Sequence, residues 1–543
     1  MPKFKKSFLL LFLLLYFPLI LFCVVGYFFS AQPKYFLKEI VEFFLFSSIV
    51  YAIGLIIFRG IFRLCWFVFS TLFLFVIAFF KTAFYYLYQS KLTISAFYII
   101  FETTGYESSG YLSTYYDNYL ILLTIVTFVF LFLTWRQLLL LYKKEIKWFY
   151  FPTFNKKGIL IYLLTISCIT GSIYIIDLKL KHNNIIFLIK DAYVSYQEAK
   201  ELFQTNLVEP KNEHIKNVSS KEEPQTYVVI IGESTSARNM GLYGYYRNTN
   251  PLLSEIKDEL LIFEDVISPH THTISSLNKM LSLSNYENPD AIYCGSIVQL
   301  ANAAGFSTYW VSNQQPIGIN ETLVTTISKA TKEQYFTNAL TNRQVEYDEA
   351  LFPFIDKVLD YEDKKKVIFI HLYGTHITYK HSYPPHFSTF TDTPVTNFPS
   401  ARSTEQINHY DNSIVYNDFI VRSIIEKVRA KNEKSYVMYF SDHGDEVFQD
   451  IDFVGHSEYH GTDPMYEIPF IVWTSEKFRE FYPTLDSLTN YLDRKYMLDD
   501  LIHSFSNLSQ IKFNQYQPER SIFNEQFRYR NRMLNSRVNF DDR

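Results

Sequence analysis

Five long apolar runs in the first third of the chain constrain its fold more than any other feature of the sequence. About 20 apolar residues suffice to cross a bilayer as a helix, and such runs, extended by flanking residues, lie near 7–33, 36–58, 64–86, 118–142 and 158–176. A cleaved signal peptide is the alternative for the first run, but this run is longer than the usual apolar core and lacks a clear small-residue cleavage site. We therefore expect five membrane-spanning helices in a transmembrane domain at 1–177.

Charged residues divide the chain into two unlike parts. Of the 51 Lys and Arg residues, 16 precede residue 181, against only 7 of the 55 Asp and Glu residues, and all 13 His residues follow it. The basic residues of the first part lie before the first run and between alternate runs, and the positive-inside rule then places the N-terminus in the cytoplasm. Five spans put everything after residue 177 on the outer side. Most ionisable chemistry is therefore expected in an outer domain.

Composition excludes several classes of protein. An apolar fraction of 48% with only 17 Gly and 19 Pro excludes a disordered or collagen-like chain. Three of the 4 cysteines lie in or beside apolar runs, so Cys294 has no partner for a disulfide within the outer part. Stability of the outer part must then come from a large apolar core.

The outer part alternates short apolar segments with longer helical patterns. A bridge at 178–225 precedes it, with a helical stripe at 185–203 that lies along the membrane surface or packs on the outer domain. From 226 to 543, strands are expected at Tyr227–Ile231, Leu261–Phe263, Thr308–Val311, Val367–Ile370, Tyr436–Phe440 and Phe470–Trp473. The alternation predicts an α/β domain with a mainly parallel sheet, whose ligands bind at the carboxyl ends of the strands.

Residues suited to metal binding follow two of these predicted strands. Glu233 comes directly after the first strand, and the adjacent Asp442 and His443 follow another, before a glycine that permits a turn. Carboxylate oxygens together with an imidazole nitrogen suit Zn²⁺. A helix-capping role is the structural alternative for Glu233 taken alone.

Hydroxyl and imidazole groups gather in three further segments. Ser268–Ile274 contains Thr271 and Thr273, and a threonine hydroxyl becomes a potent nucleophile when a bound metal lowers its pKa. Two more His-bearing segments are His371–His376 and Gly455–Gly461. Five such clusters at expected strand ends favour a catalytic site over a chance arrangement.

Behind five apolar runs the motifs come in the order GES, a Thr-bearing loop, GTH, SDHG and HG. This order resembles that of the phosphoethanolamine transferases of Gram-negative envelopes. These enzymes belong to the alkaline phosphatase and sulfatase superfamily, and the resemblance covers nearly the whole chain. It implies a zinc-dependent transfer of phosphoethanolamine from phosphatidylethanolamine to lipopolysaccharide, with release of diacylglycerol. It also implies an inner-membrane protein whose catalytic domain, 226–543, is periplasmic. The forms at 313–315 and 371–377 look closest to the branch that modifies core heptose rather than lipid A.

The resemblance also implies roles for individual residues. Glu233, Asp442 and His443 match the family's zinc ligands, and Thr273 matches its nucleophile, a further metal ligand that becomes covalently modified. Thr271 is the rival nucleophile. The residues that match phosphoryl or second-metal contacts are His376 and His460, with His456 as a competitor of His460. The residues that match donor contacts are Asn313, Glu107 and Thr104, the last standing where the family usually has Asn.

Two other functions share parts of this pattern. A phosphoglycerol transferase or phosphodiesterase of the same superfamily would keep the metal site, and a non-catalytic membrane sensor would keep the fold without needing every ligand. A sulfatase would need a C/S-x-P-x-R motif, which the sequence lacks. The resemblance implies disulfides in the outer domain of several family members, especially the lipid A modifiers. This chain cannot form them, which favours the core-modifying type or an unusual branch over the lipid A type. The partners expected are the donor phospholipid, the lipopolysaccharide acceptor and the bilayer, with no nucleic acid and with the protein as a monomer.

Overall fold

The chain folds into two compact units, an apolar unit up to residue 197 and an α/β unit from residue 198. The computed structural model describes residues 2–29, 33–88, 91–92, 97, 116–143, 156–314, 323–337, 346–376, 378–482, 485–534 and 538–543.

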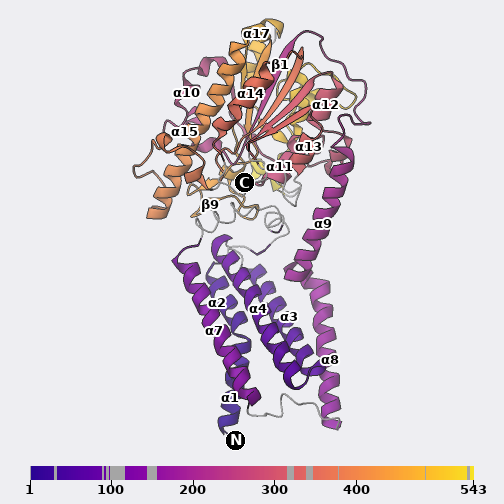
Figure 1. Cartoon of the computed structure of the whole chain (residues 1–543), viewed down its shortest axis with the longest axis vertical. Coiled ribbons are helices and arrows are strands. Elements are labelled where there is room, and N and C mark those ends of the chain that lie inside the picture. The colour runs from indigo at the N-terminus through magenta and orange to yellow at the C-terminus, as the bar shows by residue number, and fades with distance from the viewer. Residues whose placement is uncertain are drawn as a thin grey trace. The chain divides into compact units, whose positions relative to one another are not determined.

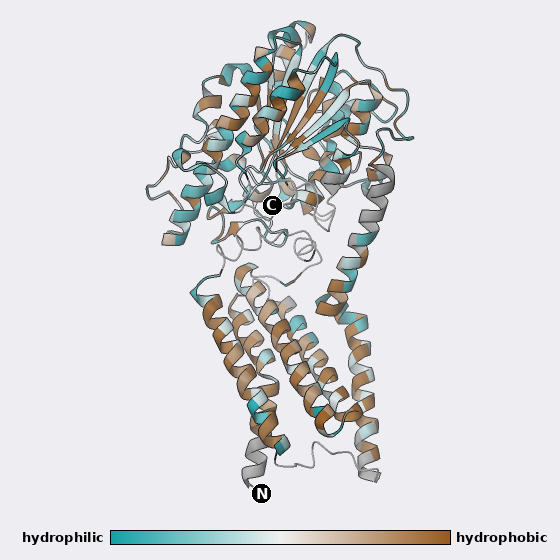
Figure 2. Ribbon diagram, in the orientation of Figure 1, coloured by the Kyte–Doolittle hydropathy of each residue, from teal (hydrophilic) through white to brown (hydrophobic). Residues whose placement is uncertain are grey.

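The apolar unit consists of helices that are apolar around most of their surface (Figure 2). Four are long and apolar enough to cross a membrane, and a fifth span exists if the pair Leu9–Leu15 and Phe17–Phe29, bent by 52°, is counted as one. Pro18 lies at this bend, where it removes a backbone donor of the helix. The described part of the chain thus has four helices long and apolar enough to span a membrane, or five if the bent pair is one broken span. The helices are α1 (Pro2–Leu15), α2 (Phe17–Phe29), α3 (Pro33–Ile57), α4 (Gly60–Tyr88), α7 (Asn118–Lys143), α8 (Lys156–Ile175) with the short turns η2 (Ile176–Leu180) and η3 (Lys181–Asn183), and α9 (Ile185–Asn206), which covers the stripe expected at 185–203.

A buried ionic group joins three of these segments. Lys81 of α4 lies 2.9 Å from a carboxylate oxygen of Glu39 and 2.9 Å from one of Glu42, both on α3, and donates to the carbonyl of Asn183 at 2.9 Å. We call Lys81, Glu39 and Glu42 the Lys81 cluster. Its side chains are at most 3% exposed, so each charge depends on the others for stabilisation. The cluster fixes the start of α9 to the α3–α4 pair.

The α/β unit is built around a seven-stranded sheet in the order β2-β10-β7-β1-β6-β4-β5. The strands are β1 (Gln225–Gly232), β2 (Leu260–Phe263), β4 (Ser307–Ser312), β5 (Glu333–Phe336), β6 (Lys365–His371), β7 (Ser435–Ser441) and β10 (Phe470–Thr474). Only β10 runs antiparallel to its neighbours β7 and β2. The predicted α/β fold with a mainly parallel sheet is confirmed, and β5 is a strand that the sequence analysis did not predict. Three further two-stranded pairs are β3 (Val266–Ile267) with β11 (Tyr496–Met497), β8 (Glu446–Val447) with β9 (Val454–Gly455), and β12 (Met533–Leu534) with β13 (Val538–Asn539).

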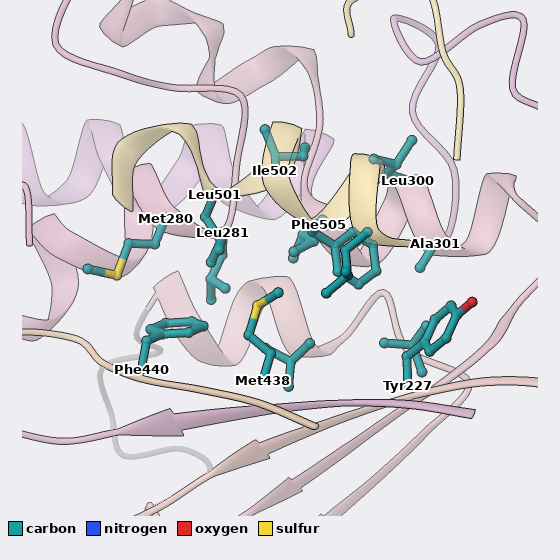
Figure 3. Close-up of a cluster of buried hydrophobic side chains, with 14 of the residues drawn as sticks. Tyr227, Met280, Leu281, Leu300, Ala301, Met438, Phe440, Leu501, Ile502 and Phe505 are labelled. Atoms are coloured by element: carbon teal, nitrogen blue, oxygen red, sulfur yellow. The ribbon is translucent and has the colours of Figure 1, made fainter. Parts of the chain in front are cut away.

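Helices cover both faces of this sheet, α10, α14 and α15 on one side and α11, α12 and α13 on the other (Figure 1). Figure 3 shows Tyr227, Met438 and Phe440 of the strands directed toward helix residues that include Leu501 and Phe505. Burial of this many large apolar groups stabilises the unit by the hydrophobic effect, and all four cysteines are free. The helices are α10 (Pro251–Ser254), α11 (Thr273–Met280), α12 (Ile297–Ala303), α13 (Leu323–Ser328), α14 (Phe352–Leu359), α15 (Ala401–Ala430), α16 (Asp463–Tyr466), α17 (Glu476–Phe481) and α18 (Leu501–Leu508).

The topology determines where a site can form. β1 lies between β6 and β7 and runs parallel to both, so the carboxyl ends of these three strands meet at one edge. From β1 the chain continues to β2, on the β7 side of β1, and then crosses to β4, on the β6 side, which makes this edge a topological switch point. Open α/β sheets bind their ligands in this position.

Candidate active site

Two carboxylates and an imidazole meet at the carboxyl ends of β1 and β7. Glu233 directly follows β1, and Asp442 and His443 directly follow β7. Nε2 of His443 lies 3.5 Å from Oε1 of Glu233 and 3.4 Å from Oδ2 of Asp442, and the three side chains are at most 3% exposed. The sheet therefore joins two motifs that are far apart in the sequence.

The hydroxyl of Thr273 completes this group. Thr273 is the first residue of α11, and its Oγ1 lies 3.2 and 3.4 Å from the two carboxylate oxygens of Glu233 and 3.4 Å from Nε2 of His443. Oγ1 of Thr271 is buried and has no hydrogen-bond partner among the described residues. The structure thus brings Thr273, rather than Thr271, to the carboxylates.

Two unusual backbone conformations hold Glu233 in place. Ser234 adopts a positive φ of 57°, which is rare for a residue with a side chain, and its N–H donates to Oδ1 of Asp442 at 3.0 Å. Gly374 has a φ of +57°, and a Cβ atom there would lie 2.9 Å from the backbone nitrogen of Glu233. The next residue, Thr375, donates to the carbonyl of Glu233 through its N–H at 3.0 Å and its hydroxyl at 2.9 Å. The GTH segment therefore contacts Glu233 closely, and only glycine fits at its turn.

The donor atoms of this group suit a metal ion. One ligand atom each from Glu233, Asp442 and His443 lies within 4.8 Å of the others. Oδ2 of Asp442 is buried and lacks a hydrogen-bond partner among the described residues. Nδ1 of His443 lies 3.0 Å from the carbonyl of Gly444; since a carbonyl only accepts, Nδ1 carries a proton, and Nε2 is the nitrogen left to face the carboxylates or a metal ion. Together with the hydroxyl of Thr273, these atoms form the oxygen and nitrogen donor set that Zn²⁺ prefers.

The electrostatics of the group also favour a cation. Burial alone would raise the pKa of Glu233, but the hydrogen bond and charge of His443 outweigh it and hold that pKa below its ordinary value. Burial, and then the charge of Glu233, raise the pKa of Asp442. Burial lowers the pKa of His443, but the negative charges of Asp442 and Glu233 outweigh this effect and hold that pKa above its ordinary value. Two buried carboxylates thus share one imidazole, and a divalent cation would balance their excess negative charge.

A second group of possible ligands adjoins the first. Nδ1 of His456 lies 2.8 Å from Oδ1 of Asp445, and the hydroxyl of Tyr379 donates to Oδ2 of Asp445 at 2.6 Å. The ring centroid of His456 lies 4.3 Å from that of His443 and 5.5 Å from that of His272. His443, Asp445 and His456 form a second set that could hold a metal ion. The sequence analysis gave no role to Asp445 or His272, although one directly follows the SDHG motif and the other precedes Thr273.

The remaining histidine candidates lie in different surroundings. The hydroxyl of Tyr373 lies 3.3 Å from Nδ1 of His376, in the turn that contacts Glu233. The ring of His460 lies 5.1 Å from that of Phe453. Of the two competing histidines, the structure brings His456 beside the carboxylates.

None of the residues predicted to contact the donor is shown beside the carboxylates in the described part of the chain. Asn313 follows β4 and is fully buried, and its side-chain amide donates to the carbonyl of Glu346 at 2.7 Å and to Asp348 at 2.8 Å. Its contact with a donor stays a prediction. Thr104 and Glu107 lie outside the described residues.

Comparison with known proteins shows the family to which the chain belongs. The family model described as Sulfatase matches residues 225–511. Over the longer range, the chain is 32% identical over 475 residues to phosphoethanolamine transferase EptC of Escherichia coli (strain K12), which covers 83% of this chain and 81% of that protein.

Two solved structures resemble this chain, one over its α/β unit and one over most of its length. A crystal structure of the C-terminal periplasmic domain of EptC from Escherichia coli in complex with Zn is 36% identical to this chain, with a TM-score of 0.56 over 59% of this chain and 92% of that domain. The integral membrane protein lipooligosaccharide phosphoethanolamine transferase A from Neisseria meningitidis aligns with a TM-score of 0.63 over 91% of this chain and 98% of that one. Its identity of 20% makes this a likeness of fold, and it extends over both the apolar unit and the α/β unit.

Proposed function

Since this chain belongs to the membrane-bound phosphoethanolamine transferases of the sulfatase superfamily, we propose that it transfers phosphoethanolamine from phosphatidylethanolamine to lipopolysaccharide through Thr273. Core heptose is the proposed acceptor, in preference to lipid A. The observation that carries the proposal is the position of the Thr273 hydroxyl, 3.2 Å from Glu233 and 3.4 Å from His443. A hydroxyl held against a carboxylate and an imidazole is the arrangement expected of an activated nucleophile.

Glu233, Thr273, Asp442 and His443 would hold Zn²⁺. When bound, the ion would lower the pKa of the Thr273 hydroxyl and balance negative charge on the phosphoryl group. The fit rests on the donor set and on the unpartnered Oδ2 of Asp442. The zinc complex of the EptC domain, 36% identical to this chain, supports the choice of metal.

In the first step, Oγ1 of Thr273 attacks the phosphorus of phosphatidylethanolamine. The bond from phosphorus to the diacylglycerol oxygen breaks, and that oxygen leaves with a proton as diacylglycerol. Oγ1 donates toward Glu233 in the structure, which gives the hydroxyl proton an acceptor as the new bond forms. Thr273 begins α11, so the first N–H groups of this helix, which have no acceptor within it, favour the negative phosphoryl oxygens.

In the second step, an acceptor hydroxyl attacks the phosphorus of the phosphoethanolamine group on Thr273. The bond from phosphorus to Oγ1 breaks, the acceptor oxygen loses its proton, and Oγ1 regains one as the Thr273 hydroxyl. His456 is the proposed histidine contact, because Asp445 fixes the orientation of its ring beside His443. His376 is a further proposed contact, since its turn lies against Glu233. Glu107 and Thr104 stay proposed donor contacts on the outer side of the membrane.

The proposed location is the bacterial inner membrane, with the N-terminus in the cytoplasm and the α/β unit in the periplasm. The basic residues at alternate ends of the spans support this orientation. The corresponding domain of EptC from Escherichia coli is described as periplasmic. A monomer is sufficient for the proposed chemistry, because one chain supplies every proposed ligand.

The test uses the full-length protein in detergent with zinc and a fluorescent phosphatidylethanolamine. We expect release of fluorescent diacylglycerol from the wild type and from Thr271→Ala, and none from Thr273→Ala. Release by Thr273→Ala at the wild-type rate would refute the assignment of the nucleophile. A protein that ignores this lipid but cleaves phosphatidylglycerol would instead be a phosphoglycerol transferase.

A further inference from the structure

A small cavity in the α/β unit lies outside the group of ligands described above. Its volume is about 180 Å³, which is below the roughly 300–1,000 Å³ of sites for drug-sized ligands. Val395, which lines it, is 77% exposed, so the cavity opens at the surface. Its size suits a single ring rather than an extended chain.

The chemistry of the lining suits a neutral, hydroxyl-rich ligand. Asn239, Asn397 and Gln449 contribute amides, Thr396 a hydroxyl and Tyr245 a phenol. Among the described residues that line the cavity, none carries a charge. Amides both donate and accept hydrogen bonds, as the hydroxyls of a sugar require. Because no described residue of the lining is charged, the cavity has no cation to attract a phosphate group.

Gln449 holds an acceptor that the protein does not use. Its Nε2 donates to Oδ1 of Asn239, whose Nδ2 in turn donates to Asp411 at 3.2 Å. These two hydrogen bonds set the orientation that both amides have in the structure. Oε1 of Gln449 is left buried and without a hydrogen-bond partner in the described part of the chain. Such an atom is costly, and a hydroxyl bound in the cavity can donate to it once the amide turns.

An exposed aromatic ring contacts one of the residues that line the cavity. Tyr246 is 53% exposed, and its hydroxyl accepts a hydrogen bond from the N–H of Val395 at 2.9 Å. The guanidinium of Arg247 lies 5.6 Å from the centroid of this ring and helps to hold it. The negative face of an aromatic ring attracts the weakly positive C–H face of a sugar. An apolar ring beside a pocket of amides is therefore a chemically suitable sugar platform.

The cavity is built from the loops that also carry the catalytic residues. Asn239 follows Glu233 in the loop after β1, and Gln449 follows His443 in the loop after β7. Phe448, between the cavity residues Val447 and Gln449, has a φ of 56°, a strained conformation that is rare for an aromatic residue and concentrates at functional sites.

We propose that this cavity binds a neutral sugar ring of the acceptor glycan, with Tyr246 stacked on the ring and Gln449 accepting a hydroxyl hydrogen. The inference rests on the proposed function, because it assigns the acceptor of that reaction to a saccharide. In this proposal Tyr246 and Gln449 bind the acceptor, and they are different residues from those that react with the donor.

The test is saturation-transfer NMR on the full-length protein in detergent, with dephosphorylated, heptose-containing core oligosaccharide as the probe. We expect the wild type to bind, and Tyr246→Ala and Gln449→Leu each to weaken binding about tenfold, the loss of one ring contact or hydrogen bond. Tyr529→Ala is the matched control, since Tyr529 is 47% exposed on the same unit, and it should bind as the wild type does. Thermal melting verifies that each variant is folded.

Absent binding by the wild type, or equal binding by all four proteins, would overturn the inference. It would also be overturned if the two variants lost affinity for anionic lipid vesicles and kept it for the sugar, because the patch would then be a membrane contact. Diacylglycerol release by the wild type without acceptor tests the proposed function separately. Release without sugar binding refutes only the cavity assignment, whereas absent release refutes the proposed function.

Discussion

Replacing Gly374 by alanine should damage the metal site from outside it. Gly374 supplies no ligand, but the new Cβ would lie 2.9 Å from N, 3.0 Å from O and 3.1 Å from Cβ of Glu233. Two of these atoms belong to the backbone, so the clash cannot be relieved by a side-chain rotation alone. We expect Glu233 to move away from Asp442 and His443.

The size of the effect follows from two contributions. An alanine in the left-handed region costs about 1–2 kcal/mol of stability, and overpacking a close contact costs about 1–3 kcal/mol. If Glu233 moves to relieve the overpacking, the overpacking energy of about 1–3 kcal/mol opposes its return to the position that binds zinc. Zinc affinity should then fall about 5- to 150-fold, at 1.4 kcal/mol for each factor of ten.

Gly244→Ala is the matched control for the backbone contribution. Gly244 has a φ of +93°, and its Cβ would meet no atom within 4 Å. This variant should therefore lose stability by about 1–2 kcal/mol and keep its zinc affinity. The assay is a zinc titration of each purified protein against a chromophoric chelator, with thermal melting in parallel. Equal zinc affinity in Gly374→Ala and the wild type, or an equal loss in both variants, would refute the reasoning.

Three other predictions concern separate parts of the chain. Burial raises the pKa of Glu446 to about 7, so the folded state loses stability as the pH rises from the ordinary pKa of about 4.5 to 7. Compared with the wild type, Glu446→Gln should be more stable by about 3 kcal/mol above pH 7 and equally stable below pH 4.5. A difference in melting temperature between the two proteins that does not change with pH would contradict this. Lys81→Met leaves two buried carboxylates without their cation and should destabilise the apolar unit by about 3–5 kcal/mol, measured as thermal aggregation in detergent; an unchanged midpoint would show that the Lys81 cluster is not structural. His456→Ala should slow diacylglycerol release about 100-fold, while His460→Ala should slow it far less, and the reverse order would reassign the histidine.

The sequence predicted the parts of the site that depend on strand ends. Glu233, Asp442 and His443 each directly follow a strand with a continuous apolar pattern, and neighbouring parallel strands bring their carboxyl ends together. The strand Glu333–Phe336 was not predicted, because it is short, only half-buried and lacks an apolar run. The break near Pro18 was also absent from the prediction, since hydropathy measures length and not direction.

The sequence did not predict which residues of the loops contact one another. His456 and His460 lie in one short segment, and only the fold shows that His456 pairs with Asp445 and adjoins His443. The hydroxyl of Tyr379, three residues after the GTH motif, donates to Asp445 of a distant segment, and no pattern in the sequence pairs these two residues. Thr273 and Thr271 were likewise separated in the sequence only by resemblance, whereas the structure separates them by their contacts.

The central claim is that Thr273 carries phosphoethanolamine between donor and acceptor. The most direct measurement is the mass of the intact protein after incubation with zinc and phosphatidylethanolamine but no acceptor, followed by peptide mapping of the modified residue. We predict a single phosphoethanolamine adduct on Thr273, absent from Thr273→Ala and removed when lipopolysaccharide is added. An adduct on Thr271, or diacylglycerol release and transfer to lipopolysaccharide by the Thr273→Ala variant, would contradict the account.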